Sequence, residues 1–152
     1  PSLRLMQQET GALLARAGVV PSFHSWRAGV NGFVIRFKGA CRVGLGMAGA
    51  VADMAPFGPA TVRLAATRTR GERVLPVAEV ECDAVRMIAE SAPVRDKVEA
   101  LGQALGRVVA HELYHLLWQK KGHERAGLAK GVLSWRELLE ATLELDGLEG
   151  RN

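Results

Sequence analysis

Hydrophobic positions recur at helical spacing in three parts of the chain. The longest pattern covers residues 93–121, where apolar side chains form one stripe: Val94, Val98, Leu101, Leu105, Val108, Val109, Leu116 and Leu117. A second pattern covers residues 2–17, and a third covers residues 134–145. Ser134 and Glu137 have capping-box spacing at the start of the third pattern. The chain is therefore expected to contain an N-terminal helix, a long helix and a C-terminal helix.

Polar residues at both ends of the long pattern suit helix termini. The acidic residues Asp96 and Glu99 suit the N-terminal end of a helix, where the helix dipole is positive. The Lys120-Lys121 pair suits the C-terminal end, where the dipole is negative. Gly122 follows directly and adopts a left-handed conformation at no steric cost. We therefore expect the helix to end in a turn at Gly122.

Shorter apolar runs between the first helix and the long helix predict β-strands. These runs cover residues 23–26, 32–37, 62–67 and 74–80. Pro76 interrupts the last run, which favours an edge position for that strand because proline cannot donate to a β-ladder. Residues 39–59 are expected to form a long loop and residues 83–91 a short helix. Together the elements predict one α+β domain over residues 1–152.

Composition and charge leave the picture of a folded domain unchanged. Hydrophobic residues make up 48% of the chain, and the formal net charge is +4. The basic residues are scattered, so no nucleic-acid partner is expected. No apolar run reaches the roughly 18 residues that a membrane span needs, so none is expected.

Cys41 and Cys82 stand 41 residues apart, and neither belongs to a CxxC pair or neighbours a histidine. Metal binding through sulfur is therefore not expected. In an exported protein the two would pair, and the closed loop would stabilise the fold by roughly 3–4 kcal/mol. Two buried, reduced thiols are the alternative. The chain begins at Pro1 and shows no signal peptide, which would suit a trimmed or mature form.

The sequence His111-Glu112-Leu113-Tyr114-His115 lies inside the longest helical pattern. Residues at i and i+4 share one face of a helix, so His111 and His115 can bind one cation. Glu112 lies about 100° further round the helix, beside that cation. A carboxylate in this place can take a proton from a metal-bound water.

Catalytic zinc normally takes three protein ligands and a water. His123 is the expected third ligand, because three of the four histidines fall within residues 111–123. Glu137 or Glu140 on the last helix is an alternative third ligand. A histidine pair satisfied by backbone carbonyls, with no metal, is the alternative to the whole site.

Residues 111–131, HELYHLLWQKKGHERAGLAKG, resemble the zincin metallopeptidases. The third histidine lies twelve residues after the first, a longer spacing than in standard metzincins. This spacing is similar to a group of small, metzincin-like bacterial proteins, many of them predicted to be exported. The resemblance covers roughly residues 74–140.

This resemblance implies a zincin-like α+β fold with a small mixed β-sheet, an N-terminal helix, a long HExxH helix and a C-terminal helix. It implies Zn²⁺ bound by His111, His115 and His123, with Glu112 as the general base of peptide-bond hydrolysis. The implied partner is a peptide or protein substrate, and the implied location is secreted or periplasmic.

The chain departs from the pattern of this group at three places. Ala129 replaces the methionine expected beneath the metal, and Trp118-Gln119 occupies the region where the group has a glycine. Tyr114 replaces a small residue inside the motif. These departures favour an alternative function: a metal-binding zincin-fold module that recognises a peptide or protein partner without cleaving it.

Overall fold

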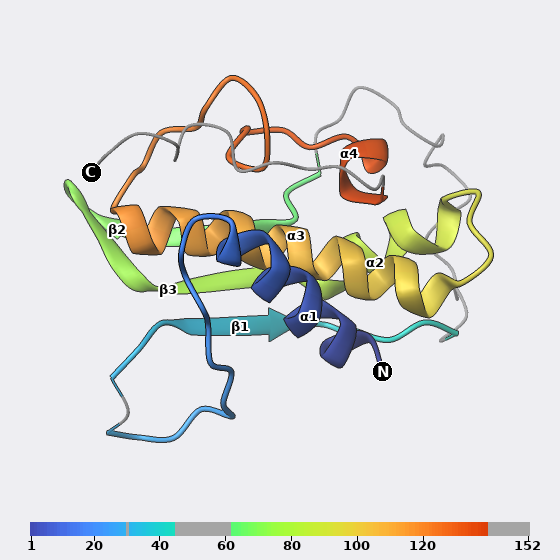
Figure 1. The fold of residues 1–152 in the computed structure, drawn as a ribbon, viewed down its shortest axis with the longest axis horizontal. Coiled ribbons are helices and arrows are strands. Elements are labelled where there is room, and N and C mark those ends of the chain that lie inside the picture. The colour runs from blue at the N-terminus through green and yellow to red at the C-terminus, as the bar shows by residue number, and fades with distance from the viewer. Residues whose placement is uncertain (30, 45–61, 140–152) are drawn as a thin grey trace.

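The computed structural model describes residues 1–29, 31–44 and 62–139 of the chain (Figure 1). Its elements, in chain order, are α1 (Ser2–Ala15), β1 (Val34–Lys38), β2 (Ala65–Arg70), β3 (Arg73–Glu81), α2 (Cys82–Ser91), α3 (Lys97–Trp118) and α4 (Trp135–Leu139). This arrangement confirms the predicted α+β fold, with an N-terminal helix, a small mixed sheet, a long helix and a short C-terminal helix.

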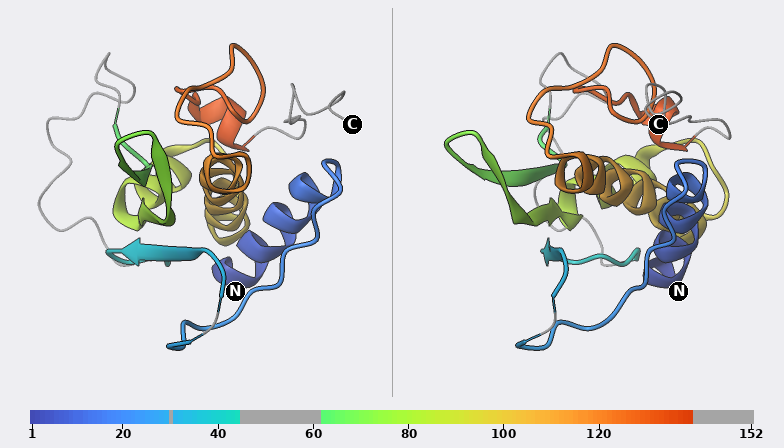
Figure 2. Two further views of the ribbon diagram at one scale, coloured as in Figure 1. Left: turned by 90° about the vertical axis from the view of Figure 1, so that its left-hand side faces the viewer. Right: turned by 60° about the vertical axis from the view of Figure 1, so that its left-hand side comes forward.

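The long helix α3 lies in the middle of the molecule. Figure 2 shows α1 on one side of α3 and the sheet on the other. Most of the α3 residues are buried, including Leu101, Leu105, Val109 and Leu116 from the predicted apolar stripe. Because α3 packs against α1, α2, α4 and the sheet, the helix that carries the motif is held from several sides.

The sheet has the order β1-β3-β2, with β1 parallel and β2 antiparallel to β3. The edge position predicted for the strand containing Pro76 is therefore wrong, because β3 is central. Pairing with β1 begins only at Val77, and the register with β2 shifts between Thr67 and Thr69. Pro76 thus lies at an irregularity of the ladder, where a missing N–H group is tolerated.

Two other local predictions also differ from the structure. Residues 23–26 form no strand, because a strand needs a neighbouring strand to pair with. Trp26 in this segment is 72% exposed. The long helix ends at Trp118, before the predicted turn at Gly122. Gln119 is the residue that adopts the left-handed conformation, with φ of 52°, and its side chain donates to the Leu116 carbonyl at 3.0 Å.

The predicted capping box is confirmed, and the structure adds a cap at Asp96 that the sequence pattern did not predict. The Asp96 side chain accepts a hydrogen bond from the Glu99 backbone N–H at the start of α3. Before α4, Ser134 and Glu137 form the predicted capping box, with the Ser134 N–H donating to Glu137 and the Glu137 N–H donating to Ser134 Oγ. The predicted continuation of α4 to residue 145, and most of the predicted loop at residues 39–59, lie outside the described residues.

Candidate metal centre

The structure brings the three predicted histidines together at the C-terminal end of α3. One nitrogen from each of His111, His115 and His123 lies within 4.8 Å of the other two. The ring centroids are 4.8–5.3 Å apart. His115 is buried, His111 is half-buried and His123 is exposed, so the cluster lies where buried structure meets the surface.

Backbone carbonyls orient the two helix histidines. His111 Nδ1 lies 2.7 Å from the Leu128 carbonyl oxygen, and His115 Nδ1 lies 2.6 Å from that of Lys120. A carbonyl oxygen only accepts hydrogen bonds, so both Nδ1 atoms must carry the proton. In a neutral ring this leaves a lone pair on Nε2, the atom available to a metal.

The two Nε2 atoms point at each other across 3.1 Å. Two neutral rings in these tautomers oppose lone pairs and cannot hydrogen-bond to each other, whereas a cation between them is attracted by both. Burial lowers the pKa of His111 to about 4, so this ring is neutral at neutral pH. The carbonyls therefore satisfy only one nitrogen of each ring, and the two facing Nε2 atoms need a positive charge between them, which a metal ion or a shared proton supplies.

The loop after α3 carries the third histidine back to the helix. Gln119 turns the chain, and the Glu124 N–H donates to the Ala129 carbonyl at 2.9 Å, which closes the loop. Gly131 lies beneath the His123 ring, where an added Cβ would lie 3.1 Å from the ring carbon Cγ. His123 therefore reaches the site through the fold of a whole loop rather than through a single glycine.

Glu112 is buried beside the cluster and is held by the sheet. Its Oε2 accepts a hydrogen bond of 2.5 Å from Thr67 Oγ1 on β2. Burial raises the pKa of Glu112, while the Thr67 hydrogen bond and the nearby His115 ring oppose this rise. A raised pKa suits a carboxylate that must hold a proton during a reaction near neutral pH.

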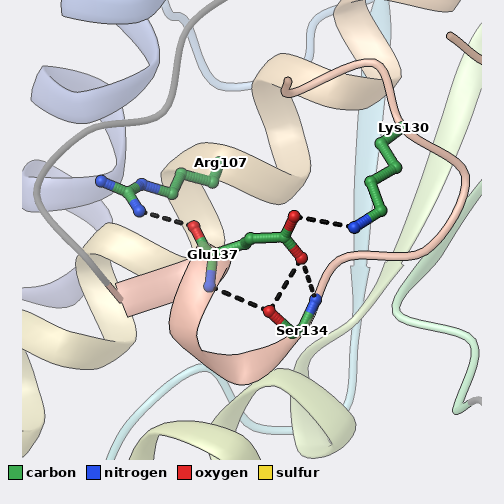
Figure 3. A network of polar contacts seen from close by, with 4 residues as sticks. All are labelled: Arg107, Lys130, Ser134 and Glu137. Atoms are coloured by element: carbon green, nitrogen blue, oxygen red, sulfur yellow. Dashed lines mark hydrogen bonds and ion pairs between the residues drawn. The ribbon is translucent and has the colours of Figure 1, made fainter. Parts of the chain in front are cut away.

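Glu137, an alternative third ligand, has other partners. Its carboxylate binds Lys130 Nζ at 2.8 Å as well as Ser134, and its carbonyl oxygen accepts from Arg107 at 2.6 Å (Figure 3). Within the described part of the chain, the group of potential ligands that converges is the three histidines, without Glu137. Glu140, the other alternative, lies outside the described residues.

The geometry fits a tetrahedral metal site. Zinc–nitrogen bonds of about 2.0–2.1 Å at tetrahedral angles place neighbouring ligand nitrogens about 3.3 Å apart. The His111 and His115 Nε2 atoms, at 3.1 Å, already have this spacing. The cluster as a whole spans up to 4.8 Å, so a bound metal would draw the rings closer together, and His123 is the most exposed of the three. Imidazole donors suit Zn²⁺ and several other transition metals.

Sequence reasoning did not find several groups that shape the centre. Thr67 lies 45 residues before Glu112, in a strand with no motif. The Lys120 and Leu128 groups that orient the rings are backbone carbonyls, which every residue has. Glu124 was also missed, although its place directly after His123 in the sequence was a signal that could have found it.

Comparison with protein-family models, curated proteins and solved structures finds no match to this chain. Fold and site together therefore define an α+β protein with a possible three-histidine metal site on and near a long helix. Cys41 and Cys82 form a disulfide, which is consistent with an extracytoplasmic location. Among the described helices, none is long and apolar enough to cross a membrane.

Proposed function

We propose that this chain is a zinc-dependent peptidase in which His111, His115 and His123 hold Zn²⁺ and Glu112 is the general base. The observation that carries the proposal is the pair of opposed Nε2 atoms, 3.1 Å apart, on rings whose Nδ1 atoms donate to carbonyls. The resemblance of residues 111–131 to the zincins supports the same function.

The reaction class follows from the residues around the centre. A bound Zn²⁺ supplies Lewis-acid chemistry, making a coordinated water more acidic and polarising a carbonyl. Glu112 accepts the proton of the attacking water and then gives it to the leaving amine. Its raised pKa suits this shuttle, and the Thr67 hydroxyl holds one carboxylate oxygen in place. Such a centre hydrolyses amide bonds, and we infer a peptide or protein substrate outside the cytoplasm.

The decisive experiment compares wild type with Glu112→Gln. We expect the variant to keep one equivalent of zinc, measured by elemental analysis, because the three imidazoles are unchanged. Peptide hydrolysis, measured with a quenched-fluorescent peptide library, should fall by about 10²–10⁴-fold because the general base is lost. Glu99→Gln is the matched control, since it makes the same change at an exposed position of the same helix.

The same experiment separates the two functions that the sequence allows. A wild type that binds zinc but cleaves no peptide in the library would replace the peptidase with a metal-binding recognition module, the alternative that the Ala129 and Trp118 departures favour. A wild type that takes up no zinc would overturn both. His123→Ala adds a test of the ligand set, because a carboxylate-completed site would retain its metal.

A further inference from the structure

The loop after α3 supplies more to the centre than its histidine. Besides His123, it supplies the Lys120 carbonyl that orients His115 and the Leu128 carbonyl that orients His111. Any movement of this loop therefore displaces one ligand and releases the orientation of the other two. The loop can keep the centre assembled only if other contacts hold it against α3.

The far end of the loop is anchored by Leu128 and Ala129, which are buried in the core, and one carboxylate makes the contacts beside His123. Glu124 Oε1 accepts a hydrogen bond from Tyr114 Oη at 2.8 Å and from Lys120 Nζ at 2.8 Å. Tyr114 is 1% exposed and lies on α3, inside the histidine motif, with its ring edge-on to that of His115. The hydroxyl thus connects the motif helix to the residue that follows His123.

We propose that Tyr114 and Glu124 are positioning residues that latch the His123 loop onto α3. This inference rests on the proposed metal centre but not on its peptidase activity. Tyr114 is the important donor, because an ion pair as exposed as Lys120–Glu124, at 37% and 38%, holds little on its own. The latch orders the loop before the metal arrives, so binding does not have to supply that ordering.

The physical consequence is a tighter site with the same ligands. Groups that orient metal ligands without touching the metal typically contribute 10–100-fold in affinity. Without the latch, His123 would be found near the other two rings for a smaller fraction of the time. Apparent affinity falls in proportion to that fraction.

The experiment measures metal binding by the full chain carrying Tyr114→Phe, Glu124→Gln or Glu124→Ala. Tyr114→Phe keeps the buried ring and removes only the hydroxyl, and Glu124 is exposed enough to change without loss of the fold. Zn²⁺ affinity is measured by competition with a chelator, and bound Co²⁺ is observed by its visible absorption. The thermal midpoint of each apoprotein shows whether the fold is intact.

We expect Tyr114→Phe and Glu124→Ala each to weaken Zn²⁺ binding by about 10–100-fold. Their effects should not add in the double variant, because both remove the same hydrogen bond. Glu124→Gln, which keeps an acceptor oxygen, should weaken Zn²⁺ binding less than Glu124→Ala does. The Co²⁺ absorption should weaken toward that of His123→Ala, which reports loss of the third ligand.

Lys121→Met is the control, because Lys121 belongs to the same loop but pairs with Glu72 at 2.6 Å, outside the latch. It should bind Zn²⁺ like wild type. If Tyr114→Phe and Glu124→Ala bind as tightly as wild type, the latch is refuted while the metal centre stands. If wild type itself binds no metal, the centre and the latch both fail.

Discussion

At the scale of single residues, Thr67 connects the sheet to the proposed general base. Its hydroxyl donates a hydrogen bond of 2.5 Å to Glu112 Oε2, and this hydrogen bond favours the charged form of the carboxylate. Removing the hydroxyl leaves a buried carboxylate with one donor fewer. The pKa of Glu112 should then rise above its already raised value.

Thr67→Val tests this role. If the peptidase function holds, the acidic limb of the pH profile for kcat/KM should move to higher pH, because Glu112 must lose its proton to act as a base. Activity near neutral pH should fall as the limb moves. Thr67→Ser keeps the hydroxyl and should leave the limb unchanged. A Thr67→Val profile that coincides with that of wild type would show that the Thr67 hydroxyl does not influence the pKa of Glu112.

At the scale of elements, the contact between α1 and α3 depends on two glycines in α3. A Cβ added at Gly106 would lie 2.5 Å from Glu9 Cβ, and one added at Gly102 would lie 2.4 Å from Leu5 Cβ. Thr10 Oγ1 also donates to the Gly106 carbonyl at 3.0 Å across this contact. The two helices therefore pack closer together than larger residues at these two positions would allow, and this close contact holds α3 against α1.

Gly106→Ala is expected to destabilise the protein by about 1–3 kcal/mol, because the backbones must separate. This loss should exceed the gain of about 1 kcal/mol that alanine brings to an exposed helix position. Gly11→Ala in α1, where an added Cβ meets nothing within 4 Å, is the matched control and should be neutral or stabilising. The urea midpoints of both variants check this, and a stabilised Gly106→Ala would contradict the packing argument.

Buried Arg107 adds a polar connection among three helices. Its Nε binds Glu9 Oε1 of α1 at 2.9 Å, and its Nη1 donates to the Glu137 carbonyl of α4. Glu137 in turn binds Lys130, at the end of the loop that carries His123 (Figure 3). A chain of polar contacts therefore connects the loop that carries His123 to the N-terminal helix.

At the scale of the whole molecule, the Cys41–Cys82 disulfide joins the segment after β1 to the start of α2. The closed loop contains β2 and β3. The three histidines lie outside it, on α3 and the following loop. Stability and metal binding should therefore respond differently when the disulfide is lost.

The free energy of unfolding of the double variant Cys41→Ala/Cys82→Ala should be about 3–4 kcal/mol lower than that of wild type, as expected for a loop of this length. Its Zn²⁺ affinity at a temperature where it remains folded should match that of wild type. Urea unfolding with and without reductant checks the first point, since reductant should destabilise wild type and leave the variant unchanged. Equal stability of the two proteins would show that the bond contributes nothing.

Local periodicity was enough to predict much of this protein. The stripe on α3, the capping box before α4 and the placing of His111, Glu112 and His115 on one helix all follow from helix geometry, which acts within a few residues. The sequence also indicated an α+β class and His123 as the third member of the cluster, although not the turn at Gln119 that brings it back.

The remainder depended on segments that meet only in the folded chain. The central place of β3 despite Pro76, the Thr67 hydroxyl at Glu112 and the carbonyls behind the imidazoles depend on pairing and chain reversal. Such contacts leave no periodic signal, because any threonine or backbone carbonyl would look the same along the chain. The sequence by itself determined which residues could hold a metal, and the tertiary structure decided how their nitrogens are aimed.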